Sequence, residues 1–276
     1  MNQQDGFTLM AAFAHWMAIA LYIATTVVAA VTLSRQSQSR RRTLLLGLFT
    51  GAVVAHAISL KFTLLADNGF RFDLLAMLSL ITWSVALLLL CLSLRHQLTL
   101  LILAIAPLAA LSELAAVHAW GTAIPRSQIS PGIAAHALLS ISAYALLTLA
   151  TLQAIYLYWL NQQLHNHRPA GMSRMLPPLQ TMESLLFGLI AFGQLLLTAS
   201  LITGALFVDD LFAQHLVHKT ALSIFAWILY SILLWGHWKN GWRGNTAVRW
   251  TLSAFAVLLL AFFGSKLALE VIFSGG

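Results

Sequence analysis

The sequence predicts an all-α fold, a polytopic membrane helix bundle with eight transmembrane helices. Of the 276 residues, 60% are hydrophobic and only 8% are charged, whereas about a quarter of the residues in a soluble domain are charged. The apolar residues fall into eight stretches, each long enough to cross a hydrocarbon core of ~30 Å as a helix. We therefore expect residues 1–276 to form a single integral-membrane domain.

The expected helices follow one another with short connectors. They span residues 7–33, 43–66, 73–94, 98–118, 132–160, 179–207, 213–238 and 248–273. The first stretch has no Lys or Arg ahead of it and exceeds the apolar core of a signal peptide, about 7–15 residues, so we expect a retained helix. Pro131 and Gly132 are placed to open the fifth helix. The longest connector, 161–178, contains a Pro177-Pro178 break typical of a loop.

The connectors on one side of the predicted membrane carry most of the basic residues. On that side lie Arg35, Arg40, Arg41, Arg42, Arg95, Arg168, Arg174, Lys239, Arg243 and Arg249, and on the other side only Arg71 and Arg126. The positive-inside rule therefore places both termini outside the cytoplasm. In a bacterial inner (plasma) membrane, that side would be periplasmic.

The remaining composition excludes several classes of function. The formal charge of +7 comes from residues scattered through short connectors, so it indicates topology and not a nucleic-acid partner. The single cysteine, Cys91, excludes an intramolecular disulfide, CxxC thiol chemistry and covalent haem attachment through CxxCH. Any haem would have to be held non-covalently.

Histidines are the strongest indication of function, because ionisable side chains inside a membrane are costly. Six of the ten histidines lie in apolar stretches, and four of these cluster near the predicted external face: His118, His136, His215 and His218. His215 and His218 share one helix face through their i,i+3 spacing. With His136 they could offer imidazoles to a haem from two sides. The alternative is an interfacial histidine that contacts only water and lipid headgroups.

Other ionisable residues lie deeper or closer to helix ends. His56 is expected near mid-bilayer and His15 roughly 12 Å into the first helix. Each of the two needs a ligand or a hydrogen bond to a neighbouring helix. Lys219 and Lys61 could snorkel to the surface or neutralise a haem propionate. Glu113 lies inside the fourth expected helix.

A series of short motifs resembles the cytochrome c assembly protein family. The motifs read His136-Ala-Leu-Leu-Ser-Ile-Ser-Ala-Tyr144, Ile202-Thr-Gly-Ala-Leu-Phe207, Lys219 with Trp227-Ile-Leu-Tyr230, and Gly241-Trp-Arg-Gly244. The resemblance covers about residues 45–270 in order. It extends to the CcsA and ResC type of haem-handling membrane protein and to the smaller HemX-like or YpjD-like members.

The resemblance implies roles for individual residues. His136 matches the family's first external haem-ligating histidine, and His56, followed by Asn68-Gly69-Phe70 and Trp83, matches a histidine that holds haem within the membrane. Lys219 aligns with a lysine that follows the tryptophan-rich WWD motif of the synthases. This chain departs from the family there, because no tryptophan lies between Phe207 and Lys219.

The departure favours the HemX-like or YpjD-like subgroup over a complete haem lyase. We therefore expect a non-catalytic protein, not an enzyme, that binds haem b and serves cytochrome c-type biogenesis as a haem-handling or assembly-accessory protein. His136 with His215 or His218 would ligate the iron, His56 would mark an inner site, and Lys219, Lys61 and His118 would support propionates or the site. The expected partners are haem, the lipid bilayer and a membrane protein.

Two other classes of function remain open from the sequence. Histidines near Asp209 and Asp210 could bind a transition metal, which would suit an accessory or regulatory subunit of an inner-membrane divalent-cation transport system. A scaffold for partner membrane proteins would instead leave each intramembrane histidine dispensable.

Overall fold

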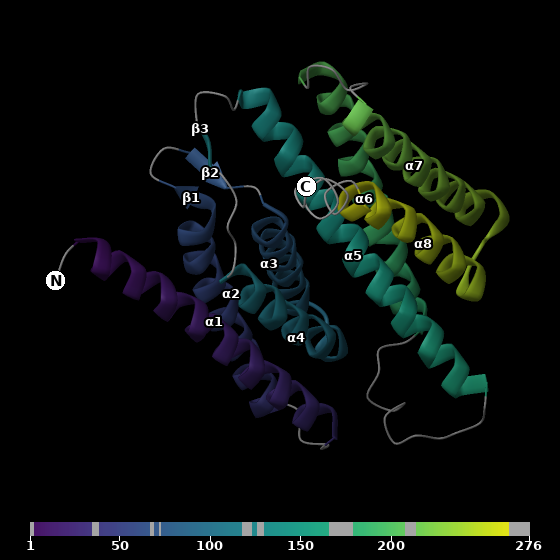
Figure 1. Ribbon diagram of the computed structural model, residues 1–276. Helices are drawn as coiled ribbons and strands as arrows, with labels where there is room; N and C mark the ends of the chain where they lie inside the picture. The colour runs from purple at the N-terminus through teal and green to yellow at the C-terminus, as the bar shows by residue number, and fades with distance from the viewer. Residues whose placement is uncertain are drawn as a thin grey trace. The chain divides into compact units, whose positions relative to one another are not determined.

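The computed structural model describes residues 3–34, 39–66, 69–71, 73–117, 123–125, 130–165, 179–207 and 214–264. Within these ranges it has eight helices long and apolar enough to cross a membrane, which confirms the predicted all-α bundle (Figure 1). The helices are α1 Gln3–Ser34, α2 Ser39–Leu64, α3 Leu74–Ser93, α4 Thr99–Ala116, α5 Pro131–His165, α6 Leu179–Phe207, α7 Gln214–Asn240 and α8 Gly244–Leu259. Most bounds lie within a few residues of those expected.

The chain divides into two compact units, Met1–Ile129 and Ser130–Gly276. In the first unit α1 packs on α2 and α4, and α3 packs on the same two helices. Tyr22, Phe49 and Leu89 are fully buried where these four helices meet. A polar group in this interior must find a partner on another helix, because neither water nor lipid can bond it there.

Three short strands, which the sequence analysis does not predict, form a small sheet in the first unit. They are β1 Leu65–Ala66, β2 Gly69–Arg71 and β3 Ala123–Pro125. β2 pairs antiparallel with both of the others. Strands of two or three residues are too short to show an alternating pattern. The sheet links the end of α2 to the connector between α4 and α5.

In the second unit α5 packs on α6 and α8, and α7 packs on α6 and α8. Helix α8 continues into a π-helical turn, Leu260–Gly264, of a kind often found at functional sites. The Tyr144 hydroxyl of α5 donates a 2.6 Å hydrogen bond to the Leu258 carbonyl just before this turn. The bond ties α5 to the end of α8.

The turn between α7 and α8 explains the motif Gly241-Trp-Arg-Gly244. Gly241 has φ of +65°, the left-handed conformation that a helix C-cap requires, and its N–H donates to the His237 carbonyl. The Trp242 ring lies directly against Gly236, where any Cβ would collide with it. His237 Nδ1 bonds the Trp242 carbonyl at 2.9 Å. These residues therefore close the helical hairpin.

Candidate functional site

The start of α5 sets the position of His136. The chain reads Ser130-Pro131, and the Ser130 hydroxyl accepts a bond from the Ile133 N–H while its carbonyl accepts one from Ala134. A serine N-cap followed by proline at the first helical position is a favourable helix start, so the predicted opening at Pro131 is confirmed. His136 follows in the second turn.

A backbone carbonyl of α6 orients the His136 imidazole. Nδ1 lies 2.8 Å from the Ser200 carbonyl oxygen. A carbonyl can only accept, so Nδ1 carries the hydrogen and the lone pair of the neutral ring is on Nε2. The Ser140 and Ser200 hydroxyls, 2.7 Å apart, join the same two helices one turn further on. Among the described residues, none hydrogen-bonds Nε2.

Gly204 makes room for this imidazole. A Cβ built at Gly204 would lie 3.0 Å from His136 Cε1 and 3.2 Å from Nδ1, closer than ordinary van der Waals contact. Gly132 has a similar role at the same end of the unit, because its Cβ would overlap the Phe207 ring. The two glycines let α5 and α6 approach closely around His136.

The other predicted residues of the outer site lie on α7 or outside the described ranges. His215 and His218 belong to the first two turns of α7, but their side chains are outside what the structure describes, as is all of His118. Lys219 Nζ lies 5.4 Å from the centroid of the Phe262 ring, a cation–π distance. That ring lies 5.3 Å from the ring of Tyr144. The structure thus brings Lys219 together with α5 and the π-helical turn.

His237 lies at the opposite end of α7 from His215 and His218. Nineteen residues separate it from His218, or about 28 Å along a helix. Its ring stacks on Phe187 with centroids 3.5 Å apart. His237 therefore cannot share a ligand with the N-terminal turns of α7.

In the first unit, His15, His56 and Glu113 form one buried cluster. Glu113 Oε1 lies 2.7 Å from His15 Nδ1, and Oε2 lies 2.9 Å from His56 Nε2. Glu113 and His56 are fully buried, and His15 is 8% exposed. Three helices, α1, α2 and α4, therefore meet through one carboxylate.

Neighbouring hydroxyls complete this cluster. Ser79 of α3 donates to Glu113 Oε2 at 3.1 Å and lies 2.9 Å from His56 Nε2. The Tyr22 hydroxyl is 3.1 Å from His56 Nδ1, and Thr63 is 3.4 Å from His15 Nε2. Both histidines therefore have hydrogen bonds to neighbouring helices, which is one of the two alternatives that the sequence left open for them.

Helices α2 and α3 bring His56 and Trp83, two residues of the family resemblance, close together. One turn of α3 carries Ser79, which bonds His56, and Trp83, whose indole N–H donates to the Val53 carbonyl at 3.0 Å. Asn68 lies outside the described residues. Lys61, at the end of α2, is exposed, as a snorkelling lysine would be.

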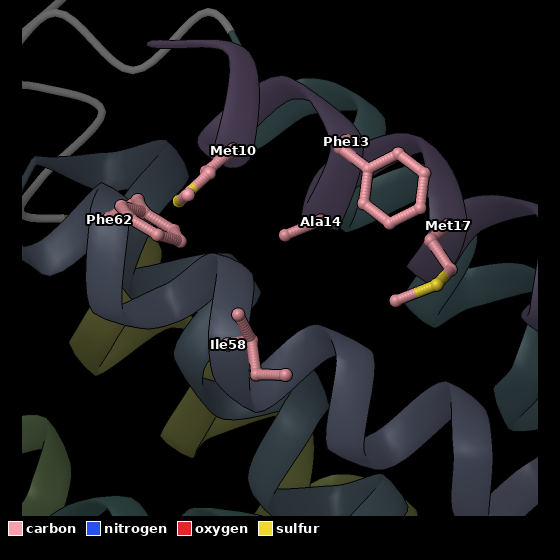
Figure 2. Close-up of a pocket in the computed structure, with 6 residues that line it drawn as sticks. All are labelled: Met10, Phe13, Ala14, Met17, Ile58 and Phe62. Carbon is pink, nitrogen blue, oxygen red and sulfur yellow. The ribbon is translucent and has the colours of Figure 1, made fainter. Parts of the chain in front are cut away.

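An apolar groove runs along the first unit between α1 and α2, with a volume of about 540 Å³. Figure 2 shows its six lining residues: Met10, Phe13, Ala14, Met17, Ile58 and Phe62. No histidine lines it, because His15 points inward to Glu113 although it follows Ala14. The groove therefore suits an apolar chain and offers no imidazole ligand.

Within the part of the chain that the structure describes, no group of three or more His, Cys, Asp or Glu side chains is arranged to hold a metal ion. In the second unit, Nδ1 of His136 and Nδ1 of His237 each bond a backbone carbonyl, and the His237 ring is covered by Phe187.

Comparison with known proteins identifies the family of this chain. A family model described as Cytochrome C assembly protein matches residues 51–273. The chain belongs to the cytochrome c assembly family. The resemblance expected over about 45–270 is therefore confirmed at the level of the family. Because the match begins within α2, helix α1 lies outside it.

Curated relatives of this cytochrome c assembly protein are membrane proteins and an uncharacterised protein. Inner membrane protein YpjD of Escherichia coli (strain K12) is 34% identical over 223 residues, which are 80% of this chain and 84% of that protein. The protein of the same name in Escherichia coli O157:H7 gives identical values. An uncharacterized 28.8 kDa protein in the nifR3-like 5'region of Azospirillum brasilense is 32% identical over 139 residues, half of each chain. No solved structure matches the chain.

Sequence reasoning missed two parts of these sites. It did not join His15 and His56 to Glu113, although three ionisable residues within the membrane were a signal that some of them pair. It also missed Ser200 and Gly204. Nothing in an apolar sequence shows which backbone carbonyl will accept a hydrogen bond from a side chain.

Proposed function

We propose that this protein is a non-catalytic haem-handling or assembly-accessory member of the cytochrome c assembly family, holding haem b non-covalently at the His136 end of the second unit. The observation that carries the proposal is the oriented imidazole of His136. Histidines that bind a metal usually donate their other ring N–H to a carbonyl or carboxylate, which fixes the tautomer. His136 has that bond already, to the Ser200 carbonyl.

The second ligand is His215 or His218. Both lie in the first two turns of α7, and α5 and α7 each pack on α6. When bound, haem b would supply a redox-active iron, which His136 and one of these two histidines would hold. The residues of this chain orient the His136 imidazole and would hold the haem propionates.

Lys219 is the residue we assign to a haem propionate. It follows His218 directly, and the Phe262 ring holds its ammonium group at the end of α8. A lysine binds a carboxylate as a point charge and needs no fixed fork geometry. Lys61 and His118 remain predicted supports.

A lyase reaction is not part of the proposal. The segment between Phe207 and Lys219 contains no tryptophan, whereas the synthases that this family includes present haem on the tryptophan-rich motif. The chain has no platform of that kind for a CxxCH peptide, so it binds haem for another protein to use.

The test is haem binding by the purified protein. His136→Ala is expected to remove the bis-histidine absorbance spectrum, because Nε2 is the assigned iron ligand. The double variant His215→Ala with His218→Ala should do the same. His237→Ala is the matched control, since His237 lies at the other end of α7, and it should keep the spectrum. A spectrum that survives either of the first two changes would show that the ligands are wrong.

We also propose the bacterial inner membrane as the location, with both termini on the periplasmic side. The support is the name of the E. coli relatives and the distribution of connector Lys and Arg, ten on one side and two on the other. Alkaline phosphatase fused after Gly276 is expected to be active, because that enzyme folds only outside the cytoplasm. An inactive fusion, with activity from a fusion in connector 161–178, would reverse the orientation.

A further inference from the structure

The buried cluster of the first unit bears on how many haems this chain holds. We infer that α1 closes the inner histidine off from haem, so that the chain holds one haem, at the His136 end of the second unit, and uses His56 to join helices. This inference rests on the proposed function for its haem count.

Glu113 is an ionised carboxylate in this arrangement. It accepts from His15 Nδ1 at 2.7 Å, from His56 Nε2 at 2.9 Å and from the Ser79 hydroxyl at 3.1 Å. An ionised carboxylate can accept all three bonds, and we assign Glu113 this state. His56 then carries its hydrogen on Nε2, the nitrogen that faces Glu113.

Both nitrogens of His56 are thereby in use. Nε2–H is directed at Glu113 and Ser79, and Nδ1 accepts from the Tyr22 hydroxyl at 3.1 Å. The Tyr22 ring also meets the imidazole edge-on, with centroids 5.7 Å apart. Tyr22 and His56 are both fully buried. An iron ligand needs a nitrogen lone pair open to the metal, and the described residues leave His56 none.

His15 joins α1 to the same carboxylate. Its Nδ1 lies 2.7 Å from Glu113 Oε1, and its Nε2 lies 3.4 Å from the Thr63 hydroxyl oxygen of α2. Both nitrogens of this ring therefore also have partners on neighbouring helices, which suits a water-excluded interior.

Helix α1 supplies the residues that close this arrangement. His15 and Tyr22 both lie in α1, which is outside the family-matched residues 51–273. His56 and Glu113 lie inside that range. Without α1, Nδ1 of His56 and Oε1 of Glu113 would lose the partners that now occupy them. The inner histidine that the family resemblance implies as a haem ligand is therefore a helix-joining residue in this chain.

Haem stoichiometry tests the inference directly. We expect one haem per chain in the unmodified protein, one in His56→Gln and none in His136→Ala. Two haems per unmodified chain, or loss of haem in His56→Gln while His136 is intact, would overturn it. A chain that binds no haem under any condition would contradict the proposed function instead.

A second measurement needs no variant. Nitrogen-15 solid-state NMR on the haem-free chain in lipid is expected to show His56 with one protonated nitrogen. Adding haem should leave the His56 signals in place and shift those of His136. A doubly protonated His56, or His56 signals that move with haem, would contradict the closed inner site.

Discussion

Glu113→Leu is expected to lower the melting temperature of the haem-free protein by roughly 10 °C, since removing one partner of a buried ion pair costs about 3–5 kcal/mol. The change removes the carboxylate that both His15 and His56 bond, and leaves His15 without its partner on α4. His56 keeps only its bonds to Ser79 and Tyr22. Intrinsic-fluorescence melting in detergent measures the effect.

The double variant His15→Leu with Glu113→Leu separates an ion pair from a packing role. Replacing both charged partners by apolar residues is often neutral or stabilising, so we expect most of the lost stability to return. A double variant as unstable as Glu113→Leu would mean that the carboxylate acts through packing and not through charge.

Glu183→Leu is the control. Glu183 is half-buried and accepts a single bond from the Gly244 N–H at 3.2 Å. Loss of one such hydrogen bond is worth about 1 kcal/mol, which corresponds to a shift of roughly 2–4 °C. A shift as large as that of Glu113→Leu would indicate a general effect of removing a carboxylate.

The architecture was readable from the sequence because its causes are local. Eight apolar stretches of membrane-spanning length predict eight helices, and Ser130-Pro131 predicts where α5 begins. The small sheet was not predicted, because β2 pairs with β3 across more than fifty residues of chain. Pairing at that separation leaves no trace in a window of neighbouring residues.

The buried cluster could be predicted only in part from the sequence. The cost of an ionisable group in a membrane indicates that His15, His56 and Glu113 each need a partner. Which partner each one finds depends on the packing of α1 against α4 and of α2 against α3. Helices that are apolar on every side carry no directional signal for such packing, so the sequence could not choose.

The outer site shows the same limit. The position of His136 near a helix end follows from hydropathy, but its orientation depends on a backbone carbonyl of α6. Every residue has such a carbonyl, so the identity of Ser200 gives no hint of it. Gly204 is likewise one of several glycines in apolar stretches, and only the packed structure shows that an imidazole lies against it.

Gly204→Ala is expected to weaken haem binding about 10–100-fold, the usual cost of disturbing a partner that orients a metal ligand. The new Cβ would lie 3.0 Å from His136 Cε1, so the ring must yield by a few tenths of an ångström. The bond from Nδ1 to the Ser200 carbonyl, on the same helix as Gly204, holds the ring at 2.8 Å. The ring therefore cannot move without lengthening the bond that orients Nε2. Haem titration followed by absorbance measures the affinity.

Two control variants on the same helix isolate this effect. Gly188→Ala places a methyl group where no atom lies within 4 Å, so haem affinity should stay unchanged while the helix gains a better helix former. Ser200→Ala removes the hydroxyl that meets Ser140 but keeps the carbonyl that holds His136, so haem binding should also persist. If Gly204→Ala binds haem as tightly as Gly188→Ala does, the assignment of His136 as an iron ligand oriented by α6 is wrong, because moving its ring would then have no effect on haem binding.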